Sequence, residues 1–223
     1  MGLRRRKHLA TRFALSETAF RLFAERGFDG VGVREIADAS NVSTTTLFKY
    51  FPSKESLVFD EDQAIEADLA RVVRERPAGV SIPEALRRYL QESLDRFTAA
   101  PERAAVMHAL MTETPALAAY AREMWLRHED TLARAIAADI GEPPDDVACT
   151  ALAHFMLESR FLASRTPDPA AAMDAIFALL DAGWAATAAA TRDAALPRSA
   201  QPRSERRARP SHDDRLSRTR RRS

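Results

Sequence analysis

Apolar residues recur three and four positions apart along almost the whole chain, and this spacing places them on one face of an α-helix. No segment alternates apolar and polar residues over the length that a half-buried strand requires. Glycine and proline residues interrupt the pattern at positions 27–32, 52, 77–83, 101, 115, 141–144, 167–169 and 197. The pattern therefore predicts an all-α protein of about nine helices.

Three of the predicted helices lie near the start of the chain, at about 9–26, 33–40 and 43–51. Asn41 falls in the turn between the second and the third, where a positive φ is needed and asparagine tolerates it best after glycine. Ser43 is a favourable N-cap for the third helix. Two short helices joined by such a turn predict a helix-turn-helix unit.

The outer face of the third helix carries Thr44, Thr45, Phe48 and Lys49. Short polar side chains with an aromatic ring and a cation are expected on a helix that lies in the major groove of DNA. The helix lacks the Arg, Asn and Gln side chains that make bidentate contacts to purines, so DNA shape and half-site spacing should supply much of the specificity. The same pattern also fits a three-helix packing unit that binds no nucleic acid.

Two neighbouring runs resemble the N-terminal domain of the TetR family of repressors, namely ETAFRLFAERGFDG and GVREIADASNVSTTTLFKYFPSKESL. The similarity covers about residues 10–58 and is most specific in LFKYFPSKESL. It implies that the third helix enters the major groove, that Tyr50 lies near a phosphate and that Lys54 contacts one. Thr44-Thr45 stands where the family often has a lysine-glycine pair. The DNA contacts carried over by position are Ser43, Thr44, Thr45, Thr46, Phe48, Lys49, Tyr50 and Lys54.

The charge of the chain is unevenly distributed. Residues 1–59 hold 10 basic and 6 acidic side chains, residues 60–191 hold 12 and 22, and residues 192–223 hold 11 and 4, which gives nets of +4, −10 and +7. A basic head on an acidic body is expected when one end meets phosphate, although chance variation in surface charge gives the same picture. The basic segment 4–7 either follows DNA phosphates or is a solvated N-terminus. The arginine-rich tail, including 220–222, is expected to be disordered.

Several functional classes find no support in the sequence. No apolar run approaches the roughly 18 residues of a membrane-spanning helix. No metalloprotease, phosphate-loop or serine-hydrolase motif occurs, and Cys149 is the single cysteine. We therefore expect a cytoplasmic protein that is not an enzyme, with no cofactor, no metal and no membrane contact.

The acidic body is predicted to contain helices at about 54–76, 82–99, 102–113, 116–139, 145–165 and 169–191. Methionine and aromatic side chains in its middle part are candidates to line a pocket for a small apolar effector. The same side chains also fit an ordinary core. The candidates are Met107, Met111, Met124, Trp125 and Phe155.

The body also resembles, without a diagnostic motif, a subgroup of TetR-like regulators suspected of binding fatty-acyl or acyl-CoA-like molecules. An acyl headgroup would need a cationic anchor, for which Arg122, Arg127 and Arg160 are the candidates. The acidic charge of the body would equally suit a cationic, lipophilic compound.

The last two predicted helices are rich in alanine and carry more apolar residues than a single core stripe requires. This surplus predicts a dimer interface that includes Phe177, Leu180 and Trp184, and members of the TetR family dimerise through this region. A pair of core helices in a monomer is the alternative.

Together these features predict a basic N-terminal arm (1–8), a helix-turn-helix domain (9–58), a helical ligand-binding and dimerisation domain (59–194) and a disordered tail (195–223). The function expected from this organisation is a ligand-responsive repressor that binds a double-stranded, palindromic operator as a homodimer. The alternatives are an activator or a regulator without a small-molecule effector, an all-helical adaptor, and an all-helical enzyme.

Overall fold

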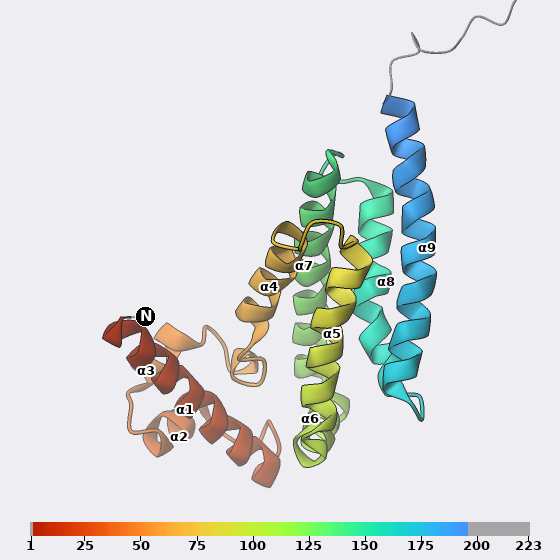
Figure 1. Ribbon diagram of the computed structural model, residues 1–223. Helices are drawn as coiled ribbons and strands as arrows, with labels where there is room; N and C mark the ends of the chain where they lie inside the picture. The colour runs from red at the N-terminus through yellow and green to blue at the C-terminus, as the bar shows by residue number, and fades with distance from the viewer. Residues whose placement is uncertain (1, 196–223) are drawn as a thin grey trace, which may run out of the picture.

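The structure is a computed structural model that describes residues 2–195, so the arginine-rich tail and the expectation of disorder there lie outside the described residues. The described part forms nine α-helices and one short 3₁₀-helix, which confirms the all-α prediction. Their bounds are α1 Leu3–Arg26, α2 Val33–Ala39, α3 Thr44–Tyr50, η1 Glu55–Leu57, α4 Asp62–Arg74, α5 Ile82–Thr98, α6 Pro101–Glu113, α7 Pro115–Ile140, α8 Val147–Ser164 and α9 Pro169–Ala195. Helices α1–α3 form a compact head, and α4, α5, α7, α8 and α9 form a bundle beside it (Figure 1).

The head packs around one apolar cluster, to which α1, α2 and α3 each contribute. Phe23, Ile36, Leu47 and Phe51 are at most 1% exposed. Asn41 has a φ of 54°, the positive value predicted for the turn between α2 and α3. The helix-turn-helix geometry is therefore fixed by a few buried side chains and by one residue that tolerates the turn.

Residues of the types that favour helix caps lie at helix ends in the body as well. Ser81 accepts a hydrogen bond from the backbone N–H of Glu84 at 3.2 Å, and Asp146 accepts one from the N–H of Cys149 at 2.8 Å. Gly141 ends α7 in the left-handed conformation. Each of these residues satisfies backbone groups that would otherwise have no partner at a helix end.

Two predicted helix boundaries were wrong. Helix α1 begins at Leu3 rather than at residue 9, because segment 3–8 holds good helix formers and no breaker, so the basic segment 4–7 is the first part of α1. The helix predicted at 54–76 is split into η1 and α4. Leu57 and Val58 are buried in the head while Leu69 and Val73 are buried in the body, and one straight helix cannot serve both cores.

Helix α6 connects the head with the body. Leu110 is buried in the cluster of the head, and Met107 and Met111 pack against it. Arg103 of α6 forms an ion pair with Glu17 of α1 at 2.8 Å. The core of the head therefore includes residues from beyond the predicted boundary at residue 58, although the domain limits themselves stay a prediction.

The bundle has a separate apolar core shared by α4, α5, α7, α8 and α9. Helices α8 and α9 lie side by side along one edge of the molecule (Figure 1). Within the described residues no helix is long and apolar enough to cross a membrane.

Candidate nucleic-acid interface

Helix α3 turns a polar face with one aromatic ring toward solvent. Thr45 and Lys49 are exposed, Thr44 is half-buried, and the ring of Phe48 is 48% exposed. On the opposite side Leu47 is fully buried in the core of the head. An exposed aromatic ring on a short recognition helix is suited to apolar contact with a thymine methyl group. Thr45, Phe48 and Lys49 are therefore accessible on α3, and their contact with DNA stays a prediction.

The first turn of α3 is stabilised by its own side chains. The Ser43 hydroxyl accepts a hydrogen bond from the backbone N–H of Thr46 at 3.1 Å and lies 2.9 Å from the Thr46 hydroxyl. This confirms Ser43 as the N-cap. These bonds give Ser43 and Thr46 a role in holding the first turn of α3, and their contact with DNA stays a prediction.

Arg12 of α1 ties the end of α3 to the segment that leads into α4. Its guanidinium donates to the backbone carbonyls of Tyr50 and Asp60, both at 2.7 Å, and lies 4.3 Å from the centre of the Phe51 ring. The ring of Tyr50 also stacks on His8 with 4.6 Å between ring centres. No local sequence pattern marks Arg12 or His8 as functional. Both contact Tyr50, which is too far along the chain for such a pattern to link them.

Lys54 is engaged within the head. Its Nζ donates to the carbonyl of Phe28 at 2.6 Å and lies 4.1 Å from the centre of the Phe28 ring. Burial lowers the pKa of this ammonium group, and the charges of Asp29 and Glu55 partly offset the effect. An ammonium group has three donors, so two remain for a phosphate. The phosphate contact implied for Lys54 stays a prediction.

Among the residues that it describes, the structure shows no shared cavity lined by the five side chains predicted to form one pocket, and the pocket stays a prediction. Met107 and Met111 pack on the core of the head, and Met124 is buried at 4% exposure. Phe155 is 56% exposed on the outer face of α8. Trp125 contacts His128 and Arg160 of the bundle, and Phe155 contacts the ring of His154. Helical spacing located the methionines and aromatic residues on helices but could not assign them to a common cavity.

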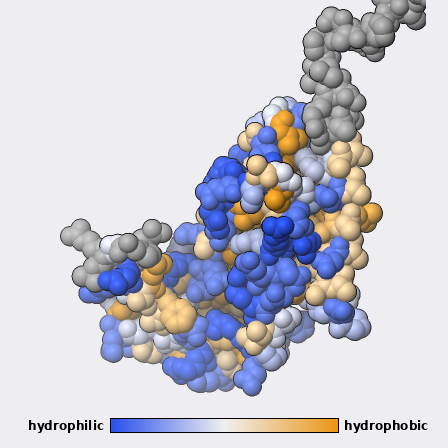
Figure 2. Space-filling view, viewed as in Figure 1, coloured by the Kyte–Doolittle hydropathy of each residue, from blue (hydrophilic) through white to orange (hydrophobic). Residues whose placement is uncertain are grey.

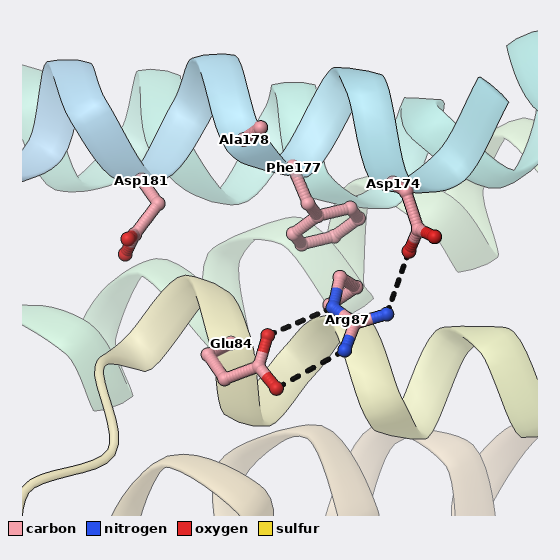
Figure 3. A pocket seen from close by; sticks show the side chains of 6 residues that line it. All are labelled: Glu84, Arg87, Asp174, Phe177, Ala178 and Asp181. Atoms are coloured by element: carbon pink, nitrogen blue, oxygen red, sulfur yellow. Dashed lines mark hydrogen bonds and ion pairs between the residues drawn. The ribbon is translucent and has the colours of Figure 1, made fainter. Parts of the chain in front are cut away.

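A small cavity of about 160 Å³ lies between α5 and α9 (Figure 3). Arg87 of α5 forms ion pairs with Glu84 at 2.8 Å and with Asp174 at 2.7 Å. The hydrogen bond from Arg87 is the main reason that the pKa of Glu84 falls to about 2. Effector pockets usually enclose roughly 300 Å³ or more and are mostly apolar. This cavity is too small and too polar to be the expected effector site.

Two of the three residues predicted at the dimer interface are buried in the bundle. Phe177 is 2% exposed and Trp184 9% exposed, and both belong to the core of the body, against which Leu180 packs. Phe177 and Trp184 are therefore core residues of the single chain, Leu180 is partly buried, and their place in a dimer interface stays a prediction. Helices α8 and α9 instead expose other large apolar side chains, and a band of apolar surface follows the edge formed by α9 (Figure 2). Those exposed residues are Phe155, Phe161, Leu162 and Leu179.

A polar cluster joins the start of α4 to the middle of α7. Asp62 accepts hydrogen bonds from Arg127 and from the Nε2 of His128, both at 2.7 Å, and Glu66 accepts one from Thr131 at 2.8 Å. Asp62, Glu66 and His128 each place one ligand atom within 4.8 Å of the others, which is the donor set of a cation site. Because protein partners already occupy each of them, we read the cluster as a polar link between α4 and α7.

Comparison with known proteins matches both parts of the chain. Residues 15–60 match the family described as bacterial regulatory proteins, tetR family, and residues 80–185 match the MftR C-terminal domain. The chain is 32% identical over 151 residues to the HTH-type transcriptional regulator TcmR of Streptomyces glaucescens, with 65% of this chain and 67% of that protein covered.

Two further similarities are consistent with these matches. The chain is 27% identical over 156 residues to the putative mycofactocin biosynthesis transcriptional regulator MftR of Mycobacterium tuberculosis, with 68% of this chain and 77% of that protein covered. The structure of Salmonella enterica GusR superposes with a TM-score of 0.52 at 23% identity, over 77% of this chain and 94% of that one. The GusR similarity supports the fold alone.

Proposed function

Since the chain belongs to the TetR family and is a DNA-binding transcriptional regulator, not an enzyme, we propose that it is a ligand-responsive repressor that binds a palindromic operator as a homodimer. It would act in the cytoplasm, where its DNA target is found. The observation that carries the proposal is the face of α3, where Thr45, Phe48 and Lys49 are exposed on a helix whose other side is anchored in the core of the head.

Binding to a promoter fragment of its own or a neighbouring gene is expected to weaken steeply with salt. A protein that neutralises 6–10 phosphates loses about 10³- to 10⁵-fold in affinity between 50 and 200 mM salt, because it releases condensed counterions. Fluorescence anisotropy over this range measures the slope, with a scrambled fragment as the control. An affinity that does not change with salt would contradict DNA binding through this face.

Lys49 and Lys54 offer a matched pair of variants, because Lys49 is exposed and Lys54 is hydrogen-bonded in the head. Lys49→Met is expected to reduce the salt slope by about one unit with no change in melting temperature. Lys54→Met is expected to reduce the slope similarly and also to lower the melting temperature by a few degrees, because the Phe28 carbonyl loses its donor. An unchanged slope in the Lys54 variant would make its role purely structural.

The exposed residues of α8 and α9 support the dimer. Phe155 and Leu162 are seven residues apart and therefore share one face of α8, and Leu179 of α9 is 75% exposed. A monomer gains nothing from large apolar side chains in water, whereas a two-fold partner would bury the same surface on both subunits. We therefore place the interface on this face in place of Phe177, Leu180 and Trp184.

The effector is the least constrained part of the proposal. A ligand regulates such a protein only if it binds more tightly to the conformation in which the two heads are spaced for DNA, or to the one in which they are not. Helix α4 follows the head directly and is tied to α7 by Asp62, so a ligand inside the bundle can change the angle between the two. A regulator without an effector, or an activator, would use the same head, and a transcription assay with and without candidate ligands separates these cases.

A further inference from the structure

The structure distinguishes among the three arginines that could anchor an anionic group. Arg122 is exposed on α7, and Arg127 is paired with Asp62 at 2.7 Å. Arg160 of α8 is partly buried and forms neither an ion pair nor a hydrogen bond with any residue of the part of the chain that the structure describes. Of the three, Arg160 is therefore the arginine that is partly buried and has no carboxylate partner among the described residues.

The guanidinium of Arg160 lies between helices of the bundle. Its central carbon is 5.2 Å from the centre of the Trp125 ring on α7. Its neighbours along α8, Met156 and Ser159, are fully buried. Burial lowers the pKa of Arg160, and the nearby Tyr89 of α5 partly offsets this effect. A cation in such a position normally has a carboxylate partner, because desolvating an unpaired charge costs free energy.

His128, which contacts the same indole ring, has one ring nitrogen without a hydrogen-bond partner among the described residues. The ring of His128 contacts Trp125 edge to face with 5.2 Å between ring centres, and His128 is fully buried. Its Nε2 is bonded to Asp62, but its Nδ1 has no hydrogen-bond partner within residues 2–195. Buried polar atoms without a partner are uncommon in folded proteins and often mark the place of a ligand or water.

We propose that Arg160 anchors the carboxylate of a small organic anion with an apolar body, held against Trp125 inside the bundle and within reach of His128. A single guanidinium balances a single negative charge and binds a carboxylate through two parallel hydrogen bonds. The indole face of Trp125, which lies against the guanidinium, suits the apolar part of such a ligand better than it suits a polyanion. This inference rests on the proposed function, because it names the chemical class of the effector.

The experiment uses the intrinsic fluorescence of Trp125. The chain has two tryptophans, so the full-length Trp184→Phe protein serves as the parent and reports from Trp125 alone. The parent is titrated with decanoate, with decan-1-ol, which has the same chain without the charge, and with inorganic phosphate, which has the charge without the chain. The titrations are repeated on Arg160→Met, on Arg160→Lys and on Arg122→Met as the exposed control.

Decanoate is expected to change the fluorescence saturably and to bind the parent about 10- to 100-fold more tightly than decan-1-ol or phosphate does. Arg160→Met should remove this preference, Arg160→Lys should keep part of it, and Arg122→Met should not alter it. The ligand-free Arg160→Met protein should melt no lower than the parent, because it no longer holds an unpaired charge.

Equal affinity for decanoate and decan-1-ol in the parent would overturn the proposal, and this comparison needs no variant. An Arg160→Met protein that melts several degrees lower and keeps its decanoate affinity would also overturn it, by making Arg160 structural. No DNA is present in these titrations, so failure of the carboxylate site and failure of operator binding are observed separately.

Discussion

Replacing Phe155 and Leu179 together by glutamate is expected to convert the protein from a dimer into a monomer and to weaken operator binding by at least about 100-fold. Both side chains lie on the outer faces of α8 and α9, at 56% and 75% exposure. Two negative charges on each subunit would meet two on its two-fold partner, in an interface that removes them from water. A dimer binds both half-sites of a palindromic operator with its two heads, which raises its affinity. A monomer binds one half-site at a time and loses this gain in affinity.

Sedimentation gives the oligomeric state of this double variant, and anisotropy gives its affinity for the operator. Leu126→Glu is the matched control, because Leu126 is similarly exposed, at 58%, but lies on α7. Circular dichroism should show the same helix content in all three proteins. A double variant that stays dimeric while Leu126→Glu becomes a monomer would move the interface to α7.

Local features of the head could be predicted from the sequence because they depend on residues close together in the chain. The positive φ of Asn41 and the N-cap at Ser43 follow from the chemistry of single residues. The burial of Ile36 and Leu47 follows from helical spacing. Because Leu47 faces the core, Thr45 and Lys49 on the other side of α3 must face solvent.

The orientation of α8 and α9 could not be predicted in the same way. Both helices are so rich in alanine and other apolar residues that no polar face marks the side turned to solvent. Phe177 and Leu179 therefore looked equivalent in sequence, although one is 2% and the other 75% exposed. Only the position of α5 and α8 against α9 decides which of them is in the core.

Contacts between residues far apart in the chain could not be predicted from the sequence either. Arg12 reaches the carbonyl of Tyr50, and Asp62 reaches His128, over separations of 38 and 66 residues. Neither pair belongs to a motif of fixed spacing. Histidine and aspartate on separate helices are common surface residues, so their meeting inside the protein depends on how α4 packs on α7.

Asp62→Ala is expected to destabilise the protein by about 1–3 kcal/mol, the usual cost of leaving a buried polar group without its hydrogen-bond partner. Asp62 is 7% exposed and accepts from both His128 and Arg127. Without it, fully buried His128 would have no hydrogen-bond partner at either ring nitrogen among the described residues. For a chain of this size the loss corresponds to a melting temperature lower by about 3–10 °C.

Two variants make this measurement specific to the link between α4 and α7. Asp62→Asn keeps a carbonyl oxygen that can accept from His128 and loses only the charge opposite Arg127, so it should cost clearly less than alanine. Asp130→Ala removes an exposed carboxylate that pairs with Arg134 one turn along α7, and it should change stability by less than about 0.5 kcal/mol. Thermal unfolding of the three proteins at one pH and concentration gives the comparison. If Asp62→Ala melts like Asp130→Ala, the buried cluster does not hold α4 on α7, and a ligand in the bundle would have to reach the heads by another path.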